Sequence, residues 1–192
     1  MEVKEPAVAY SKQNIAIEEY LEMENASVEK HEYYKGEVFA MVGGRRVHGR
    51  VVSNLNAALK IALRGSPCQV FAESMKVQPA DDVILYPDVF VTCDAADLRT
   101  EQIFRAPKLV IEVLSPSTQA YDRSLKFALY RHLGSLQEYA LVDPDTRRIE
   151  VFRVGADGLW VLHDMSERAL LDIACLDAQV LLADVFAGLD GA

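Results

Sequence analysis

Two nearly continuous apolar stretches of the chain each contain one acidic residue. Residues 109–114 hold Glu112 among apolar side chains and end at Ser115–Pro116, and residues 83–92 hold Asp88 in the same way. A short apolar run of this kind is typical of a strand that is buried on both faces. Burying a carboxylate without a partner is costly, because the charged form loses its hydration. The pattern therefore predicts two strands whose acids share one site.

Hydrophobic periodicity divides the rest of the chain into helices and further strands. Apolar residues at helical spacing predict helices over residues 15–29, 47–63 and 115–134. Pro87, inside the Asp88 stretch, predicts a bulge in that strand or a place where one ladder hydrogen bond is missing. Alternation and turn residues predict the other strands, over residues 31–42 (a hairpin turning at Lys35–Gly36), 68–78, 138–145, 148–154, 159–163 and part of 169–189.

We expect a single domain over residues 15–192, preceded by a loose arm over residues 1–14. The 192 residues are 51% hydrophobic and 26% charged, which is typical of an ordered globular protein. No apolar run reaches the ~20 residues of a membrane helix, and the first residues lack the basic-then-apolar order of a signal peptide. These features predict a cytoplasmic protein without membrane contact.

The three cysteines, Cys68, Cys93 and Cys175, predict buried thiols rather than a disulfide or a zinc site. Their number is odd, they are scattered, and each lies within or beside an apolar segment. We therefore expect no covalent crosslink in the fold.

The charge of the chain is unevenly distributed. The formal net charge of -9 argues against a protein that coats nucleic acid nonspecifically, because phosphate binding depends on Lys and Arg. One basic patch on an acidic body could still accept a phosphate backbone, and a solvated helix face is the alternative interpretation. Residues 38–72 contain no acidic residue and five basic ones, Arg45, Arg46, Arg50, Lys60 and Arg64.

The two interior acids point to metal-assisted hydrolysis. Acids from neighbouring strands can hold a hard divalent cation such as Mg2+, which prefers oxygen ligands and keeps waters for substrate phosphates. Such an ion polarises a phosphoryl oxygen, and a nearby lysine can assist the attacking water. Pro87–Asp88 followed by Glu112 matches the first two parts of the PD-(D/E)XK nuclease signature. The third part departs from it, because Leu114 stands where that signature has lysine.

A more specific resemblance covers roughly residues 15–190. It is carried by Tyr33–Met41, Tyr86–Val89, Leu109–Thr118, Asp122 with Lys126 and Tyr130, and Glu138–Tyr139 with Val142–Pro144. In order and spacing these segments resemble the Uma-two family of restriction-endonuclease-like proteins. The resemblance implies an α/β (α+β) fold, a restriction-endonuclease-like mixed β-sheet flanked by helices. It also implies a nuclease that uses Mg2+ or Mn2+ to cut DNA, commonly as a homodimer.

The resemblance assigns roles to the acids and supplies the missing lysine. It makes Asp88 and Glu112 the metal ligands and places the catalytic lysine at Lys126, in the helix that follows the Glu112 strand. The alternative for Lys126 is an ordinary exposed ion pair with Asp122, four residues earlier, worth only ~0.3 to 0.5 kcal/mol.

Further site residues follow from the same resemblance and from the basic patch. Glu37 matches an acid that supports the metal shell, although a solvent-side strand residue would look the same in sequence. His48 matches a histidine of the family, with a capping or structural role as the alternative. We expect His48 to contact substrate together with Arg45, Arg46 and Arg50.

Functions of different classes remain consistent with the sequence. The first is a Mg2+-dependent endonuclease acting on DNA. The second is a non-catalytic module that keeps the nuclease fold for nucleic-acid or protein binding, which Leu114 and the acidic composition favour. A structural subunit of a larger nuclease complex is a third. A Lys126 side chain that pointed away from both acids would favour the binding module.

Overall fold

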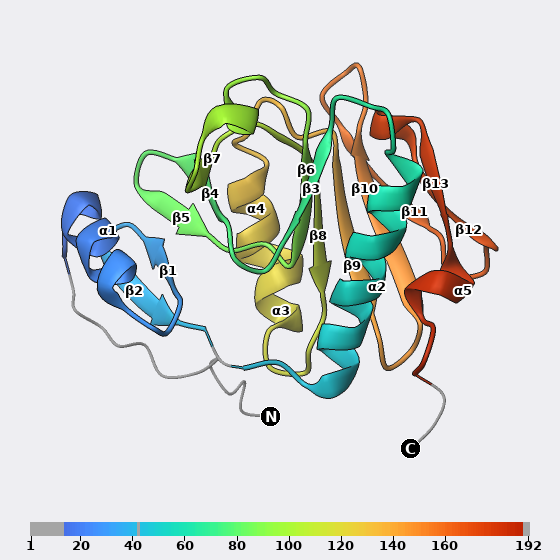
Figure 1. Cartoon of the computed structure of the whole chain (residues 1–192), viewed down its shortest axis with the longest axis horizontal. Helices are drawn as coiled ribbons and strands as arrows, with labels where there is room; N and C mark the ends of the chain where they lie inside the picture. Colours follow the sequence, from blue (N-terminus) through green and yellow to red (C-terminus); the bar gives the residue numbers. More distant parts are fainter. Residues whose placement is uncertain (1–13, 42, 190–192) are drawn as a thin grey trace.

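A six-stranded mixed sheet forms the centre of the structure, a computed structural model that describes residues 14–41 and 43–189 (Figure 1). Its strand order is β11-β10-β9-β8-β6-β3. Neighbouring strands are antiparallel except β8 and β9, which are parallel because a helical segment returns the chain between them. In the sheet order, the strands span Trp160–Asp164, Arg148–Val154, Glu138–Asp143, Pro107–Val113, Val89–Thr92 and Gln69–Ala72.

A second sheet of five strands packs beside the first, in the order β2-β1-β5-β4-β7. Its strands span Glu37–Ala40, His31–Tyr34, Val83–Leu85, Lys76–Ala80 and Ile103–Phe104. A separate hairpin pairs β12 (Leu170–Ile173) with β13 (Ala178–Leu181). The helices are α1 (Ile17–Ala26), α2 (Arg46–Ala62), α3 (Gln119–Tyr121), α4 (Phe127–Tyr130) and α5 (Leu182–Val185), with 3-10 turns at Asp97–Arg99 and Ala174–Leu176.

Alternating side chains of β8 enter two different apolar cores. Leu109, Ile111 and Val113 share a core with α2, α5 and the β12–β13 hairpin. Val110 lies on the opposite face, in a core with α4 and residues of the second sheet. Because successive strand residues point to opposite faces, Glu112 points to the same side as Val110. The strand thereby aims its one acid towards the helical segment that carries Lys126.

Helix α1 and the β1–β2 hairpin form a layer at one side of the molecule (Figure 1). The hairpin predicted within residues 31–42 is confirmed, with β1 and β2 paired antiparallel. β1 also pairs with β5, so backbone hydrogen bonds join this layer to the strand that leads to Asp88. The layer has its own apolar core, formed by Ile15, Tyr20, Tyr33, Val38 and Ile84.

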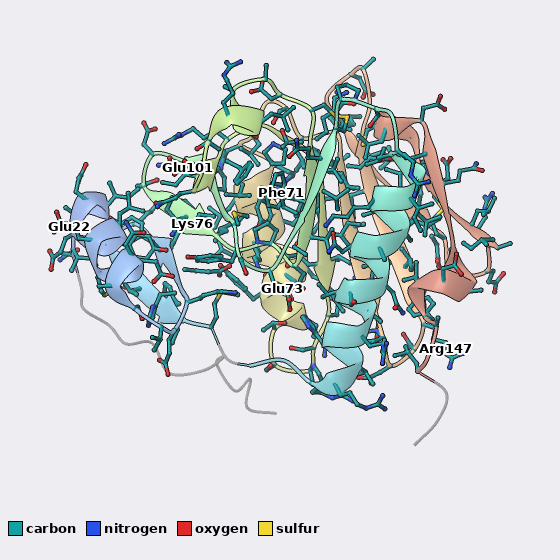
Figure 2. The ribbon with its side chains drawn as sticks, in the orientation of Figure 1. Glu22, Phe71, Glu73, Lys76, Glu101 and Arg147 are labelled. Carbon is teal, nitrogen blue, oxygen red and sulfur yellow. A yellow bond between two sulfur atoms is a disulfide. The ribbon has the colours of Figure 1, made fainter. Side chains whose placement is uncertain are left out.

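Two predicted strands are each divided between the two sheets, which corrects the sequence interpretation. The stretch 68–78 forms β3 and β4, and the break contains Glu73, whose φ of 58° is left-handed (Figure 2). The stretch 83–92 forms β5 and β6 on either side of Tyr86–Asp88. Pro87 has no backbone N–H to donate to a ladder, so the chain leaves one sheet there and enters the other.

The helix predicted over residues 115–134 forms over residues 119–130 and contains a π-helical turn. This turn, Asp122–Lys126, separates α3 from α4. Single π turns inside helices occur frequently at functional sites. Its two end residues, Asp122 and Lys126, are both buried. The exposed ion pair considered for them from the sequence is therefore excluded.

Cys68 and Cys93 form a disulfide, so the prediction of three buried thiols is wrong. Cys68 directly precedes β3, Cys93 directly follows β6, and the antiparallel register that pairs Gln69 with Thr92 sets the cysteines opposite each other. Their Cα atoms are 4.1 Å apart. The bond depends on a pairing between strands that cysteine spacing does not reveal. Cys175 is the free thiol, and burial raises its pKa.

The mixed sheets flanked by helices confirm the predicted fold class. Within residues 14–41 and 43–189, no helix has the length and apolar character needed to cross a membrane. The arm predicted over residues 1–14 lies outside the described residues except for Asn14. The single domain over residues 15–192 stays a prediction.

Removing the Cys68–Cys93 disulfide should lower the free energy of unfolding by about 3 kcal/mol, because a crosslink across 25 residues restricts the unfolded chain. Urea unfolding of the Cys68→Ser/Cys93→Ser double variant beside the wild type measures the change. Cys175→Ser is the matched control, since it removes a thiol and leaves the crosslink in place. An unfolding midpoint that does not move in the double variant would contradict this account.

Candidate active site

Asp88 and Glu112 meet at one end of the central sheet. The register of β6 and β8 pairs Val89 with Ile111, which sets Asp88 beside Glu112. Asp88 N donates a hydrogen bond to Glu112 Oε2 at 3.3 Å, and Val113 N donates to Asp88 Oδ2 at 2.7 Å. Glu112 is only 1% exposed, whereas Asp88 is partly open to solvent. The structure thus brings together the two acids that the sequence singled out.

His48 reaches Asp88 from the first turn of α2. Its Nε2 lies 3.2 Å from Asp88 Oδ2, and both side chains are partly exposed. Gly44 passes close to the imidazole, because a Cβ at that position would lie 3.1 Å from His48 Nδ1. A side chain at Gly44 would therefore have to displace the ring. His48 and Asp88 form the more open part of the cluster, on the side from which a substrate could approach.

The Lys126 ammonium is surrounded by oxygen atoms. The residue is 5% exposed, and its Nζ donates a hydrogen bond to the carbonyl oxygen of Tyr86 at 3.2 Å. The π-helical turn turns both of its end residues inward, so Lys126 meets acids from its own helix and from two strands. Its Nζ lies 3.0 Å from Glu112 Oε1, 3.2 Å from Glu32 Oε1 and 3.9 Å from Asp122 Oδ1.

Glu32 is the member of this cluster that the sequence analysis missed. It lies in β1, is 6% exposed and reaches Lys126 from the second sheet. A signal was present, since Glu32 precedes two tyrosines in a predicted strand just as Glu112 interrupts an apolar one. The predicted Glu37 is exposed at the start of β2. Among the described residues, no hydrogen bond or ion pair is found that joins Glu37 to the cluster.

Two basic residues of α2 lie at the end of the helix that carries His48, and Lys60 lies at the other end. Arg46 and Arg50 are exposed in its first two turns. Arg45, just before the helix, donates to both carboxylate oxygens of Asp145, at 2.6 and 3.0 Å. That pair is solvent-exposed, so it contributes little stability.

Burial and mutual repulsion control the charges in the cluster. Burial raises the pKa of Glu112 well above its usual range, and Asp88 and Asp122 raise it further against the attraction of Lys126. Burial lowers the pKa of Lys126, but Glu112 and Glu32 outweigh this and raise it, so the ammonium stays charged. Three carboxylates therefore surround one ammonium and Asp88 lies beside Glu112, so an added cation would relieve the excess of negative charge.

The pKa values of two flanking groups are also raised. Burial raises the pKa of Asp122 to about 6, against the attraction of Lys126. Burial opposes protonation of His48, but its hydrogen bond to Asp88 and the charge of that carboxylate raise the pKa of the imidazole above its ordinary value. Asp122 thus changes charge closer to neutral pH than an aspartate in water does, and the His48 imidazole is protonated more readily than a free imidazole.

The cluster fits a hard cation with an incomplete set of protein ligands. Within the described residues, no three His, Cys, Asp or Glu side chains converge on one metal position. A cation bound by Asp88 and Glu112 would have two carboxylate ligands, and water and phosphate would complete its coordination shell, as is common for Mg2+. Among the described residues Glu112 Oε1 accepts no hydrogen bond although it is buried, and the Lys126 ammonium lies 3.0 Å from it.

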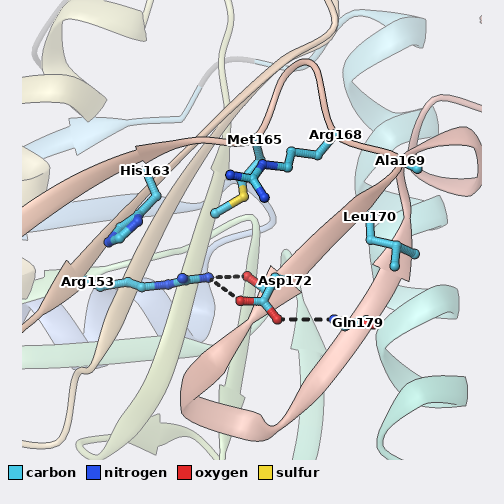
Figure 3. Close-up of a pocket in the computed structure, with 8 residues that line it drawn as sticks. All are labelled: Arg153, His163, Met165, Arg168, Ala169, Leu170, Asp172 and Gln179. Carbon is cyan, nitrogen blue, oxygen red and sulfur yellow. Dashed lines mark hydrogen bonds and ion pairs between the residues drawn. The ribbon is translucent and has the colours of Figure 1, made fainter.

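A separate cavity of about 360 Å3 lies against the β12–β13 hairpin (Figure 3). Its central cation, Arg153, is already paired with Glu138 and with Asp172. Glu138 also accepts hydrogen bonds from the backbone N–H groups of Ala174 and Cys175. This arrangement fastens the hairpin to β9 and β10, and we assign it a structural role. The cavity is lined by Arg153, His163, Met165, Arg168, Ala169, Leu170, Asp172 and Gln179.

The sequence of the chain is similar to a known protein family and to two proteins of one Synechocystis strain. Over residues 17–182 the chain matches the Uma2 family, described as "Putative restriction endonuclease". An uncharacterized protein of Synechocystis sp. (strain ATCC 27184 / PCC 6803 / Kazusa) is 36% identical over 173 residues, which cover 90% of this chain and 91% of that protein. A second uncharacterized protein of the same strain is 31% identical over 160 residues, covering 81% of this chain and 90% of its own.

A solved structure shares the fold. It is the crystal structure of "a putative nuclease belonging to DUF820" from Anabaena variabilis ATCC 29413, with a TM-score of 0.73 and 20% sequence identity. The match covers 90% of this chain and 97% of that one. The resemblance and the fold class predicted from the sequence are confirmed by these findings.

Replacing Asp122 by Asn should stabilise the metal-free protein increasingly as the pH rises. The pKa of Asp122 is about 6 in the folded state against 3.8 ordinarily, so the folded protein favours the protonated carboxyl. The contribution of Asp122 to stability is complete below pH ~4 and is lost as the pH rises through ~6. The variant should therefore gain roughly 2 to 3 kcal/mol relative to the wild type between pH 4.5 and 7.5.

Urea unfolding with chelator at several pH values in that range measures this difference. Asp81→Asn, at an exposed turn residue, is the control for effects of charge alone. A stability difference between Asp122→Asn and wild type that stays constant with pH would contradict the buried-carboxylate account.

Proposed function

Because the chain belongs to the Uma2 family of restriction-endonuclease-like proteins, we propose that it is a metal-dependent endonuclease that hydrolyses DNA phosphodiester bonds. The observation that carries the proposal is the buried Lys126 ammonium, which lies 3.0 Å from Glu112. Glu112 is in β8, and the pairing of β8 with β6 sets it beside Asp88. Acid, acid and lysine are the groups that this hydrolysis needs, and here they come from three separate elements. A buried cluster of this kind is costly to maintain in a protein that uses it only for structure.

In this proposal Asp88 and Glu112 hold one divalent cation, Mg2+ or Mn2+. When bound, such an ion polarises a phosphoryl oxygen and lowers the pKa of a coordinated water. The two carboxylates are held in place by the protein itself, since Asp88 is fixed by Val113 N and its own N–H fixes Glu112. Their excess negative charge, with Glu32 and Asp122 nearby, favours a cation over a neutral ligand.

Lys126 acts as a charged donor rather than as a base. Its raised pKa keeps the amine protonated at neutral pH, because buried carboxylates surround it. An ammonium beside the two acids can orient the attacking water and stabilise the negative charge that develops on the phosphoryl oxygens. Glu37, which the resemblance places in the site, has no part in this proposal, because Glu32 is the acid that contacts Lys126.

The first turns of α2 offer a surface for the DNA backbone. His48 lies at the open side of the acids, whereas Arg46 and Arg50, each two residues from it, point to the other side of the helix. A duplex at the acids would have to extend past the end of α2 to reach them. Phosphate contacts position a duplex without reading its sequence. Cutting both strands of a duplex calls for two such sites, so we propose that the protein acts as a homodimer.

The geometry favours catalysis over the binding module. That module would tolerate a lysine pointing away from the acids, whereas Lys126 points at Glu112. Leu114 is buried in the apolar core beside α4, so its position is filled by a packing residue. In this proposal Lys126, on the helical segment, performs the function of the lysine that the PD-(D/E)XK signature has on the strand.

Purified protein should nick supercoiled plasmid in the presence of Mg2+ or Mn2+ and not in the presence of chelator. Glu112→Gln and Lys126→Met should each lower the cleavage rate by about a hundredfold or more, because each removes a group that contacts the reacting centre. Gel separation of supercoiled, nicked and linear forms over time gives the rates.

The control for these variants is Glu101→Gln, at an exposed residue in the connection before β7 (Figure 2). Circular dichroism should show that all the variants fold. If the wild type leaves plasmid and single-stranded DNA intact with either metal, the binding module becomes the preferred function.

Arg46→Ala/Arg50→Ala should weaken DNA binding about equally for unrelated sequences and reduce the slope of log affinity against log salt by about 1 to 2. Fluorescence anisotropy with labelled duplexes and Ca2+ in place of Mg2+, at several salt concentrations, measures both. Arg148→Ala, on the exposed part of β10, is the control for the loss of charge. An unchanged salt slope in the double variant would place the DNA elsewhere.

A further inference from the structure

Both carboxylate oxygens of Glu32 are fixed by groups around the candidate site. Oε1 accepts a hydrogen bond from Tyr86 N at 3.1 Å, and Oε2 accepts one from Tyr121 OH at 3.1 Å. The Lys126 ammonium lies 3.2 Å from Oε1. These groups come from the segment before Asp88, from α3 and from the π-helical turn. The carboxylate is therefore held in one orientation and presents a fixed charge to Lys126.

Glu32 and Glu112 share the same ammonium. Lys126 Nζ lies at nearly equal distances from them, 3.2 Å and 3.0 Å, whereas Asp122 is 3.9 Å away. Within the described part of the chain, Glu112 Oε1 makes no hydrogen bond and forms its ion pair with the ammonium. If Glu32 lost its charge, Glu112 would become the dominant anionic partner of Lys126. The ammonium would then be drawn towards the carboxylate that is proposed to bind the metal.

Tyr86 ties this arrangement to the segment that bears Asp88. Its N–H donates to Glu32 and its carbonyl accepts from Lys126. Its hydroxyl donates to Glu24 Oε1 at 2.7 Å, in α1. Tyr86, two positions before Asp88, thus contacts Glu32, Lys126 and helix α1. Small shifts of Glu32 would be transmitted to Lys126 and to the acid pair.

We propose that Glu32 is a positioning residue of the active site, which holds the Lys126 ammonium between two carboxylates and prevents it from neutralising Glu112. The inference rests on the endonuclease proposed above, since it concerns how that site keeps its metal-binding acid available. It makes β1, a strand of the second sheet, a necessary part of the site.

A purely structural role does not account for Glu32. A buried ion pair that only fastened two layers could be replaced by well-packed apolar residues at little cost or with a gain in stability. The layer also contains a second buried glutamate, Glu24, which already joins α1 to Tyr86 and to His31. Glu24 makes no ion pair with Lys126 among the described contacts. Glu32 differs from it in facing the ammonium.

This difference gives a matched pair of variants, Glu32→Gln and Glu24→Gln. Both keep the size of the side chain and an acceptor oxygen, and both lie in the same buried layer. We expect Glu32→Gln to lower kcat for plasmid nicking about tenfold or more with little change in KM, and Glu24→Gln to change it less than about threefold. In a Lys126→Met background, Glu32→Gln should lower the rate less than about twofold, because the positioning acts through the lysine.

A second readout does not depend on cleavage. Acetic anhydride labels accessible uncharged amines, and peptide mass spectrometry of the metal-free full chain reports the labelling of Lys126. We expect Glu32→Gln to raise this labelling rate at least about fivefold, because the ammonium loses one of the two charges that hold it, and Glu24→Gln to leave it unchanged. Thermal unfolding of each variant verifies that the labelled protein is folded.

The two readouts separate the two proposals. A wild type that cuts no DNA overturns the endonuclease, while faster labelling of Lys126 in Glu32→Gln would still support the positioning. Unchanged labelling in folded Glu32→Gln overturns the positioning. Equal losses of kcat in Glu32→Gln and Glu24→Gln, or an undiminished loss in the Lys126→Met background, overturn it as well.

Discussion

The buried ammonium of Lys126 is the interaction on which the arrangement of the other elements depends. A cation in a medium of low dielectric is tolerated only when acids and hydrogen-bond acceptors are held close to it. Here the oxygens come from β1, from β8, from the carbonyl of Tyr86 and from the π-helical turn itself. Each element must therefore be in register before the charge is matched, and an error in one of them leaves an ion without a partner.

The paths of the chain between the two sheets follow from the same requirement. The chain crosses from the central sheet to the second sheet at Glu73 and returns through Tyr86–Asp88, and Glu73 N donates to the carbonyl of Asp88 at 3.0 Å. The two crossings are thus hydrogen-bonded to each other beside the acids. At the other end of β6, the disulfide from Cys93 to Cys68 ties the strand to β3. β6 is held at both ends, which limits how far Asp88 can shift relative to Glu112.

The parts of this site that the sequence revealed are those with a local signature. Asp88 and Glu112 each interrupt an apolar run, and their meeting needs only that neighbouring strands pair. Lys126 was found through family resemblance, because its spacing from Asp122 equally fits an ordinary helix pair. Glu32 was missed in favour of Glu37, which lies only five residues away on the paired strand. The hairpin register puts both acids on the same face, so the choice between them depends on which position along the hairpin lies against Lys126, and that is a contact across 94 residues of sequence. The disulfide was not predicted for the same reason, since strand pairing and not cysteine spacing brings Cys68 to Cys93.

The position of the lysine explains why an extra layer of the fold reaches the site. A lysine at position 114 would share the face of Glu112, but that position is filled by Leu114, which packs in the core beside α4. Moving the ammonium to the helix lets the strand keep an apolar residue there. An ammonium on the helix is no longer held by its own strand, however, and needs carboxylates from elsewhere to fix it. Glu32 supplies one of them from β1. The departure from lysine at position 114 and the burial of Glu32 are therefore two consequences of one rearrangement, in which the catalytic charge is carried by one element and oriented by another.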